Sequence, residues 1–213
     1  MNDFIDVIKY LHREGYSDPE STSATASSAG GLVLASAVLQ SLMRGERLLG
    51  SMVLQAPFLD PLASLTDKSM PLSQVEVGEW GDVANDRKYY EIMNKYSPYE
   101  LLGRMKSESI SNFPDLLILC GEKDSRVPAW QSVKFITRLR KIIKSTQDGT
   151  CTSDVNLYKS GGTVRTKRRI YLLVDKDRGH FEGDGRGLDP AKAGQNDFDP
   201  FSHKAIRNIF LME

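Results

Sequence analysis

Ser28 is a candidate nucleophile, because it lies in a short turn between sequence typical of a strand and sequence typical of a helix. Residues 21–27 are small and compatible with β structure, and an apolar helical pattern runs over 32–43. The turn reads Ala26-Ser27-Ser28-Ala29-Gly30. It approaches the G-x-S-x-G pattern of a nucleophile elbow, with alanine in place of the first glycine. Ser28 is favoured over the preceding serine because a glycine follows it by two residues.

Two later residues strengthen this interpretation, since turns rich in serine, alanine and glycine are common and the motif alone is weak. Asp124 follows the short apolar run 116–120, and His180 follows the apolar run 170–174. Both runs are expected strands, and functional side chains in open α/β sheets gather at the carboxyl ends of the strands. The order serine, acid, histidine along the chain is also the order that serine hydrolases of this architecture use.

These three residue types can together perform acyl transfer. A serine hydroxyl is a poor nucleophile until a base removes its proton. Neutral imidazole, with a pKa of about 6.5, can take that proton and later return it to the leaving group, while a carboxylate orients the imidazole. The alternative is that Asp124 is an ordinary turn residue and His180 an ordinary exposed histidine. His12 is expected at the surface, and His203 is expected to be structural.

Strands and helices alternate along the chain, which predicts an α/β domain with a parallel sheet. The expected strands are 21–27, 48–55, 116–120 and 170–174, and the expected helices are 3–14, 32–43, 86–96, 129–144 and 203–211. Residues 145–169 are polar and end in a basic cluster, and a connection of this length is typical of a flexible surface insertion. The cluster could contact an acidic partner, but a solvated loop is the favoured interpretation.

The composition of the 213 residues excludes several classes of protein. Lys plus Arg and Asp plus Glu both number 28, so the footprint of a nucleic-acid or anionic-membrane binder is missing. No uncharged apolar run approaches the ~18 residues of a membrane span. Cys120, at the end of an apolar run, is expected to be a reduced and buried thiol. A cytoplasmic protein is the default expectation.

Several motifs, in order, resemble the prolyl oligopeptidase family of serine peptidases, and in particular its oligopeptidase B branch. The resemblance covers nearly all of residues 2–143 and 170–182. The motifs that carry it are Gly15-Tyr16-Ser17-Asp18-Pro19, Ser28-Ala29-Gly30-Gly31, Ala56-Pro57-Phe58-Leu59-Asp60, Met70-Pro71-Leu72, Glu79-Trp80-Gly81, Tyr89-Tyr90, Lys95-Tyr96-Ser97-Pro98-Tyr99, Cys120-Gly121, Asp124-Ser125-Arg126-Val127, Trp130, Lys134-Phe135 and Gly179-His180-Phe181.

The resemblance implies Ser28 as nucleophile, Asp124 as acid and His180 as base, in an α/β-hydrolase fold that needs no metal or organic cofactor. It implies the backbone N–H of Ala29 as an oxyanion donor. It also implies that Arg126, two residues after the aspartate, holds the substrate backbone.

Oligopeptidase B enzymes cleave short peptides after Arg or Lys, and the resemblance implies acidic groups before the Glu-Trp-Gly motif as the reason. Glu76 matches one such position, whereas Gly78 stands where a second glutamate is expected. Glu76 could also be a plain surface glutamate, and Trp80 is expected to pack near the pocket.

Members of this family carry an upstream β-propeller and further hydrolase strands, including a tyrosine that supplies half of the oxyanion hole. The chain is therefore expected to be a partial catalytic domain spanning 1–213, comprising the C-terminal half of a mostly parallel sheet. Its expected partners are peptide substrates and an upstream propeller, and no nucleic acid or membrane. An esterase and a non-catalytic fragment remain as alternatives. We expect the isolated chain to express poorly, to bind hydrophobic dyes and to have little activity.

Overall fold

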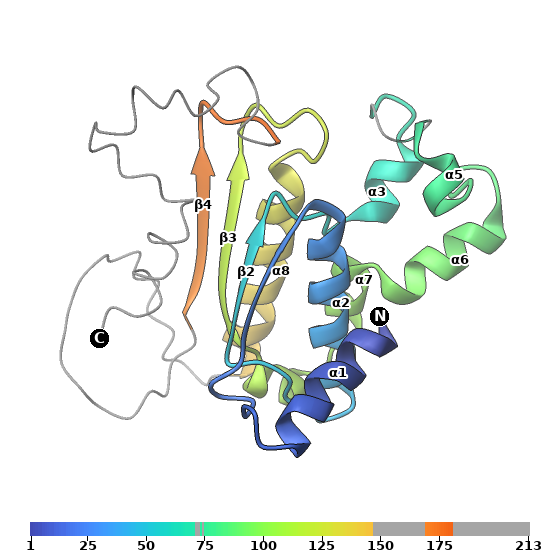
Figure 1. Cartoon of the computed structure of the whole chain (residues 1–213). Helices are drawn as coiled ribbons and strands as arrows, with labels where there is room; N and C mark the ends of the chain where they lie inside the picture. Colours follow the sequence, from blue (N-terminus) through green and yellow to red (C-terminus); the bar gives the residue numbers. More distant parts are fainter. Residues whose placement is uncertain (71–72, 74, 147–168, 181–213) are drawn as a thin grey trace, which may run out of the picture.

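The computed structural model describes residues 1–70, 73, 75–146 and 169–180, which form a sheet flanked by helices (Figure 1). The strands are β1 (Ser23–Ser27), β2 (Ser51–Gln55), β3 (Asp115–Gly121) and β4 (Ile170–Asp175). They lie side by side in the order β1-β2-β3-β4, and all three pairings are parallel. The predicted α/β architecture with a parallel sheet is confirmed. Because the strands are parallel, their carboxyl ends all lie at the same end of the sheet.

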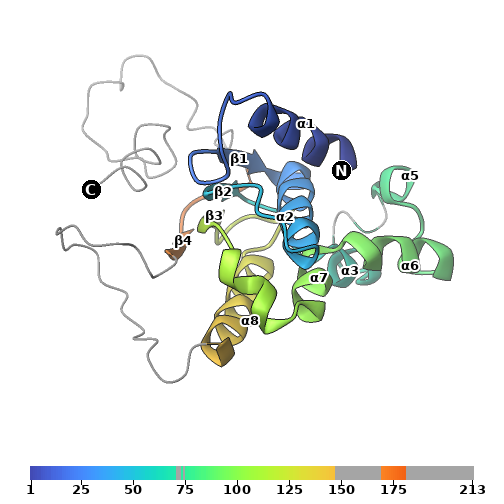
Figure 2. The ribbon, with the colours of Figure 1, turned by 90° about the horizontal axis from the view of Figure 1, so that it is seen from below.

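Helices α2 and α8 cover one face of this sheet, and α3, α5 and α6 lie beyond α2 (Figure 2). The helices are α1 (Asn2–Arg13), α2 (Ser28–Met43), α3 (Pro61–Thr66), α5 (Val77–Trp80), α6 (Arg87–Tyr96), α7 (Pro98–Arg104), the 3₁₀ helix η1 (Ser107–Asn112) and α8 (Trp130–Thr146). Among the helices of the described ranges, none is long and apolar enough to cross a membrane.

The main core lies between the sheet and the helices α2 and α8. All seven residues of β3 are buried, as expected for an apolar run in an inner strand, and Leu116 and Ile118 are fully enclosed in this core. Leu39 of α2 and Leu139 of α8 reach it from the helix side. Burying such side chains stabilises the fold by roughly 1.5–3 kcal/mol each. The core therefore anchors the strands whose ends carry the candidate site residues.

A second, smaller core lies between the start of α2 and helices α3 and α6. It contains Leu32, Phe58, Leu62, Leu65, Val83, Met93 and Val127, with Trp80 and Tyr96 packed against it. This cluster joins the helices after β2 to the loop that follows β3. Phe58 and Val127 of this cluster, together with Trp80, also line the pocket of the candidate site.

The observed elements differ from the expected ones mainly at their ends. Helix α2 begins at Ser28 rather than at residue 32, and β2 begins at Ser51, so that the buried Leu48 and Leu49 precede the strand. Residues 58–110, where one helix was expected, also contain α3, α5, α7 and the start of η1. The expected helix 203–211 and nearly all of the expected insertion 145–169 lie outside the described residues.

Local signals, a cap in one case and a proline in both, explain where two of the unexpected helices begin. These elements are too short to show a hydrophobic period. Asp60 precedes α3 and accepts a hydrogen bond from the backbone N–H of Ala63 at 3.3 Å, with Pro61 in the first turn. Pro98 likewise lies in the first turn of α7, but the side chain of its N-cap Ser97 makes no capping hydrogen bond. Their boundaries are set by capping and proline placement rather than by amphipathic spacing.

Candidate active site

Ser28 occupies a strained turn between β1 and α2. Its φ angle is +50°, a conformation that residues with a Cβ seldom adopt. Alanine at position 26 is compatible with this turn, because even a Cβ added to Gly30 would lie 3.7 Å from the Ala26 methyl, an ordinary van der Waals contact. The sharp bend lifts the Ser28 side chain to the carboxyl edge of the sheet. The departure from G-x-S-x-G is thus accommodated by the structure.

Gly31 allows the first turn of α2 to approach the segment after β2. A Cβ at this position would meet the Cβ of Pro57 at 2.6 Å and its Cα at 2.9 Å. A hydrogen bond from the Phe58 N–H to the Ser28 carbonyl oxygen, at 3.0 Å, also joins the segment after β2 to the start of α2. This close approach holds the turn bearing Ser28 in place.

Asp124 lies in the loop that follows β3, and it is 3 % exposed. Its Oδ1 accepts hydrogen bonds from the backbone N–H groups of Arg126 at 2.9 Å and of Val127 at 2.8 Å. Its Oδ2 lies 2.7 Å from His180 Nδ1. The carboxylate is therefore locked by its own loop, with one oxygen directed at the imidazole.

His180 lies between the other two residues. Its Nδ1 contacts Asp124 and its Nε2 lies 3.0 Å from Ser28 Oγ. An ionised carboxylate can only accept hydrogen bonds, so Nδ1 donates, and in the neutral ring Nε2 is left to accept the hydroxyl proton. The three residues that the sequence singled out separately are thus brought together by the structure.

Gly121, at the end of β3, makes room for the loop that carries the histidine. A Cβ there would lie 2.1 Å from the carbonyl oxygen of Arg178. Backbone hydrogen bonds from Glu122 to Asp175 at 2.8 Å and from Lys123 to Arg178 at 3.1 Å join the two loops. The distance between Asp124 and His180 therefore depends on contacts between backbones, which no motif encodes.

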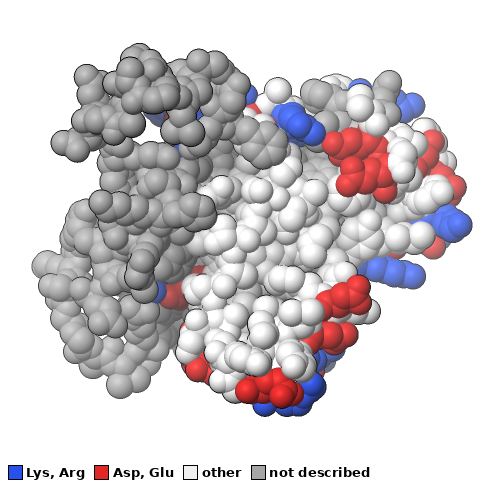
Figure 3. Space-filling model, viewed as in Figure 1, with Lys and Arg blue, Asp and Glu red and all other residues white. Residues whose placement is uncertain are grey.

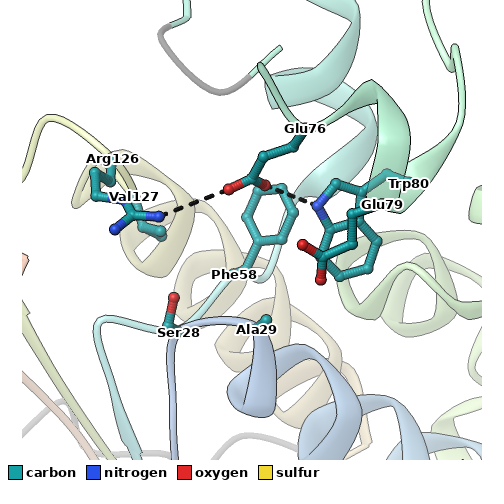
Figure 4. A pocket seen from close by; sticks show the side chains of 8 residues that line it. All are labelled: Ser28, Ala29, Phe58, Glu76, Glu79, Trp80, Arg126 and Val127. Atoms are coloured by element: carbon teal, nitrogen blue, oxygen red, sulfur yellow. Dashed lines mark hydrogen bonds and ion pairs between the residues drawn. The ribbon is translucent and has the colours of Figure 1, made fainter. Parts of the chain in front are cut away.

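A small pocket of about 140 Å³ opens beside Ser28 (Figure 4). It is lined by Ser28, Ala29, Phe58, Glu76, Glu79, Trp80, Arg126 and Val127. Drug-sized ligands occupy pockets of roughly 300–1,000 Å³, so this one has room for about one side chain. The three other residues expected at the site, namely Ala29, Glu76 and Arg126, all line it.

The walls of the pocket combine aromatic rings with charged groups. The rings of Phe58 and Trp80 lie 5.8 Å apart, centre to centre, and are inclined at 57°. Glu76 Oε2 accepts a hydrogen bond from Trp80 Nε1 at 2.8 Å, and its Oε1 lies 3.7 Å from Arg126 Nη2. The expectation that Trp80 packs near the pocket agrees with this placement, and Glu76 is not an isolated surface residue.

Three pocket residues were not assigned a role from the sequence: Phe58, Glu79 and Val127. Each belongs to a motif that carried the family resemblance, so the signal was present without an individual function attached. Within the described ranges, no group of three or more His, Cys, Asp or Glu residues is placed to hold a metal ion.

Comparison with known proteins identifies the family of this chain. The family model described as "Prolyl oligopeptidase family" matches residues 1–186. The chain belongs to the prolyl oligopeptidase family. The resemblance drawn from the motifs is thereby confirmed.

Individual members of the family cover most of this chain. The prolyl endopeptidase-like protein of Xenopus laevis is 37 % identical over 182 residues, 85 % of this chain and 23 % of the relative. Oligopeptidase B from Leishmania major is 27 % identical with a TM-score of 0.64, over 84 % of this chain and 20 % of that one. Oligopeptidase B from Trypanosoma brucei with covalently bound antipain is 28 % identical with a TM-score of 0.64, over 84 % and 21 %.

The sheet is thus that of a prolyl oligopeptidase-type α/β-hydrolase domain. The chain spans only 20–23 % of the length of these relatives.

Proposed function

We propose that this chain is the catalytic part of a serine peptidase that cleaves short peptides after Arg or Lys. The observation that carries the proposal is the position of His180, with Nε2 3.0 Å from Ser28 Oγ and Nδ1 2.7 Å from Asp124 Oδ2. Membership of the prolyl oligopeptidase family supports the same chemistry.

In the proposed reaction, Ser28 Oγ attacks the carbonyl carbon of the scissile peptide bond while His180 Nε2 takes the hydroxyl proton. Asp124 stabilises the imidazolium that forms. The imidazolium then gives its proton to the leaving nitrogen as the C–N bond breaks, which leaves an acyl-enzyme on Ser28. Water, deprotonated by the same imidazole, releases the acid and restores the serine.

Two further groups are proposed to bind the substrate around this centre. The backbone N–H of Ala29 lies in the first turn of α2, where helix N–H groups have no partner within the helix, and it is proposed to stabilise the tetrahedral oxyanion. The Arg126 side chain is 52 % exposed at the pocket, and it is proposed to hold a backbone carbonyl of the peptide.

The proposed preference for Arg or Lys rests on the acidic character of the pocket. Glu76 and Glu79 both line it, within a stretch, residues 69–86, that contains four acids and no Lys or Arg. A carboxylate in a small pocket with aromatic walls favours a cationic side chain that has an apolar stem. The residue before the scissile bond is therefore expected to be basic.

Paired substrates that share one arginyl acyl group test the proposal, one a fluorogenic amide and the other an ester. We expect the chain to release product from both and Ser28→Ala from neither, with Ser27→Ala as the matched control that retains activity. Release from the ester with no detectable release from the amide, at an enzyme concentration and reaction time that would reveal a rate lowered ~10³-fold, would identify an esterase. A folded chain that turns over neither substrate would overturn the proposal in favour of a non-catalytic role.

A further inference from the structure

The two glutamates of the pocket differ in how their charge is already satisfied. Each carboxylate oxygen of Glu76 has a partner, one being Trp80 Nε1 and the other the Arg126 guanidinium. The Glu76 side chain is only 19 % exposed. A substrate cation that approached Glu76 would therefore compete with Arg126 for this carboxylate.

Glu79 lies one helical turn later, on α5, and lines the same pocket. Figure 4 shows its carboxylate turned toward the interior of the pocket, alongside the ring of Trp80. Among the described residues, its carboxylate forms no hydrogen bond or ion pair, and the side chain is exposed. The Glu79 carboxylate is therefore available to bind a cationic group of a ligand in the pocket.

We propose that Glu79 is the carboxylate that binds the basic side chain of the substrate, whereas Glu76 is a positioning residue that holds Arg126. This inference rests on the proposed function, and it identifies the group that recognises the substrate's cation. It requires no displacement of the Arg126–Glu76 pair, so one substrate can use Arg126 and Glu79 together. Glu79 would then supply the charge that Gly78 lacks.

The surroundings of Glu79 favour a cation over a neutral ligand. Acidic side chains gather over the α3 and α5 part of the molecule (Figure 3), which agrees with the four acids of residues 69–86. Acidic groups near the pocket attract an approaching cation, although Lys68 and Arg87 flank this stretch. The Phe58 and Trp80 rings can cover the apolar stem of an arginine or lysine, and Trp80 can contact its charged head.

Binding of benzamidine, a planar amidinium, to the chain tests the proposal by calorimetry without needing turnover. We expect Glu79→Gln to raise the dissociation constant of benzamidine about tenfold or more. This is the loss of affinity expected when a charge-assisted hydrogen bond is removed. Glu76→Gln should raise it less than about threefold, because glutamine still accepts from Trp80. Glu91→Gln removes the same charge from an exposed position of α6 and should leave the dissociation constant of benzamidine unchanged. Circular dichroism confirms that each variant is folded.

A second measurement separates the roles of the two glutamates. In turnover of matched peptides with arginine or its neutral isostere citrulline, Glu79→Gln should lower kcat/KM for the arginine peptide alone. Glu76→Gln should lower kcat/KM for both peptides by the same factor, because Arg126 loses its anchor.

Benzamidine binding that is absent, that is unaffected by Glu79→Gln, or that depends on Glu76 instead would overturn the assignment of Glu79. The reaction of Ser28 with a fluorophosphonate is read separately. Reaction at Ser28 without Glu79-dependent binding leaves the proposed function standing and removes this inference. Glu79-dependent binding without reaction at Ser28 does the reverse.

Discussion

Asp124 uses its two carboxylate oxygens for different tasks, and this division orients the imidazole beside it. Oδ1 accepts two backbone N–H groups of its own loop, so the carboxylate cannot rotate without losing both hydrogen bonds. Oδ2 is then left facing His180 Nδ1. Rigid positioning of this kind fixes the tautomer in which Nε2 faces Ser28. At the scale of single residues, these hydrogen bonds restrict the orientations of the Asp124 carboxylate and of the His180 ring.

Cys120 lies four residues before Asp124 in the sequence, and its burial predicts an unreactive thiol. It is 1 % exposed, and burial raises the pKa of its thiol to about 11; a hydrogen bond with Ser132 opposes this shift, and the charge of Asp124 adds a smaller increase. In the Cys151→Ser variant, where Cys120 is the remaining cysteine, we expect no alkylation by iodoacetamide at pH 8 in the native state. Denaturant should give full alkylation. Rapid native labelling, counted by mass spectrometry, would show that the thiol is accessible.

The same pKa shift makes stability depend on pH in a defined direction. The unfolded thiol ionises at its ordinary pKa of about 9, before the folded one does, so the unfolded state binds fewer protons between pH 9 and 11. The contribution of Cys120 is therefore fully present below pH 9 and is lost as the pH rises toward 11. Cys120→Ala should flatten this part of the stability curve.

Among the elements, α2 depends on a close approach that only glycine permits at one position. We expect Gly31→Ala to lower the free energy of unfolding by about 1–3 kcal/mol, because its Cβ would collide with Pro57. Gly30→Ala is the matched control, since its Cβ would make an ordinary contact at 3.7 Å and alanine favours helix by up to ~1 kcal/mol. Urea titrations measure both variants. Equal midpoints for the two would contradict this account of the turn.

The sequence predicted those elements whose pattern is long and periodic, and it predicted the candidate residues that follow strands. Helix α8, expected at 129–144, is of this kind, whereas β3 was predicted from its short continuous apolar run. Ser28, Asp124 and His180 were placed by their positions after strands. What brings the three within hydrogen-bonding distance was not predictable, because it depends on backbone contacts such as the one that Gly121 makes with Arg178.

The pocket was predicted less completely than the three residues, for a physical reason. Helix α5 has four residues, too few for a hydrophobic period, so the direction of Glu79 could not be derived from spacing. Glu76 was assigned by resemblance to its motif, yet its contact with Arg126 joins the start of α5 to the loop after β3, and a contact between segments so far apart in the sequence could not be derived from spacing.

At the scale of the molecule, β1 pairs with β2 alone among the described strands, and within the described residues no strand pairs with its other edge. We expect the isolated chain to bind a hydrophobic dye and to self-associate in sedimentation velocity. Thr25→Lys, on β1, should reduce the association, because charge on an edge strand opposes edge-to-edge pairing. Thr137→Lys, at an exposed position of α8, adds the same charge away from β1 and should not reduce the self-association. A monomer that binds no dye, or an equal effect of both variants, would contradict this.

The oxyanion site is also a property of the molecule as a whole. Ala29 supplies the one donor proposed from the described residues, and loss of a single oxyanion donor typically lowers the rate by ~10²–10³. Turnover of the amide substrate by the isolated chain is therefore expected to be slow, and the ester, whose acylation has a lower barrier, is the more sensitive readout.

The most direct test of the serine chemistry is covalent labelling with a fluorophosphonate, with the modified residue mapped by mass spectrometry. The account predicts a single adduct on Ser28 that disappears in Ser28→Ala and persists in Ser27→Ala, the neighbouring serine of the same turn. Asp124→Asn should slow labelling by about 10³–10⁴-fold, because the imidazole loses its orienting carboxylate, while Asp3→Asn on exposed α1 should not slow it. An adduct elsewhere, or equal labelling rates for the chain and Asp124→Asn, would contradict the account.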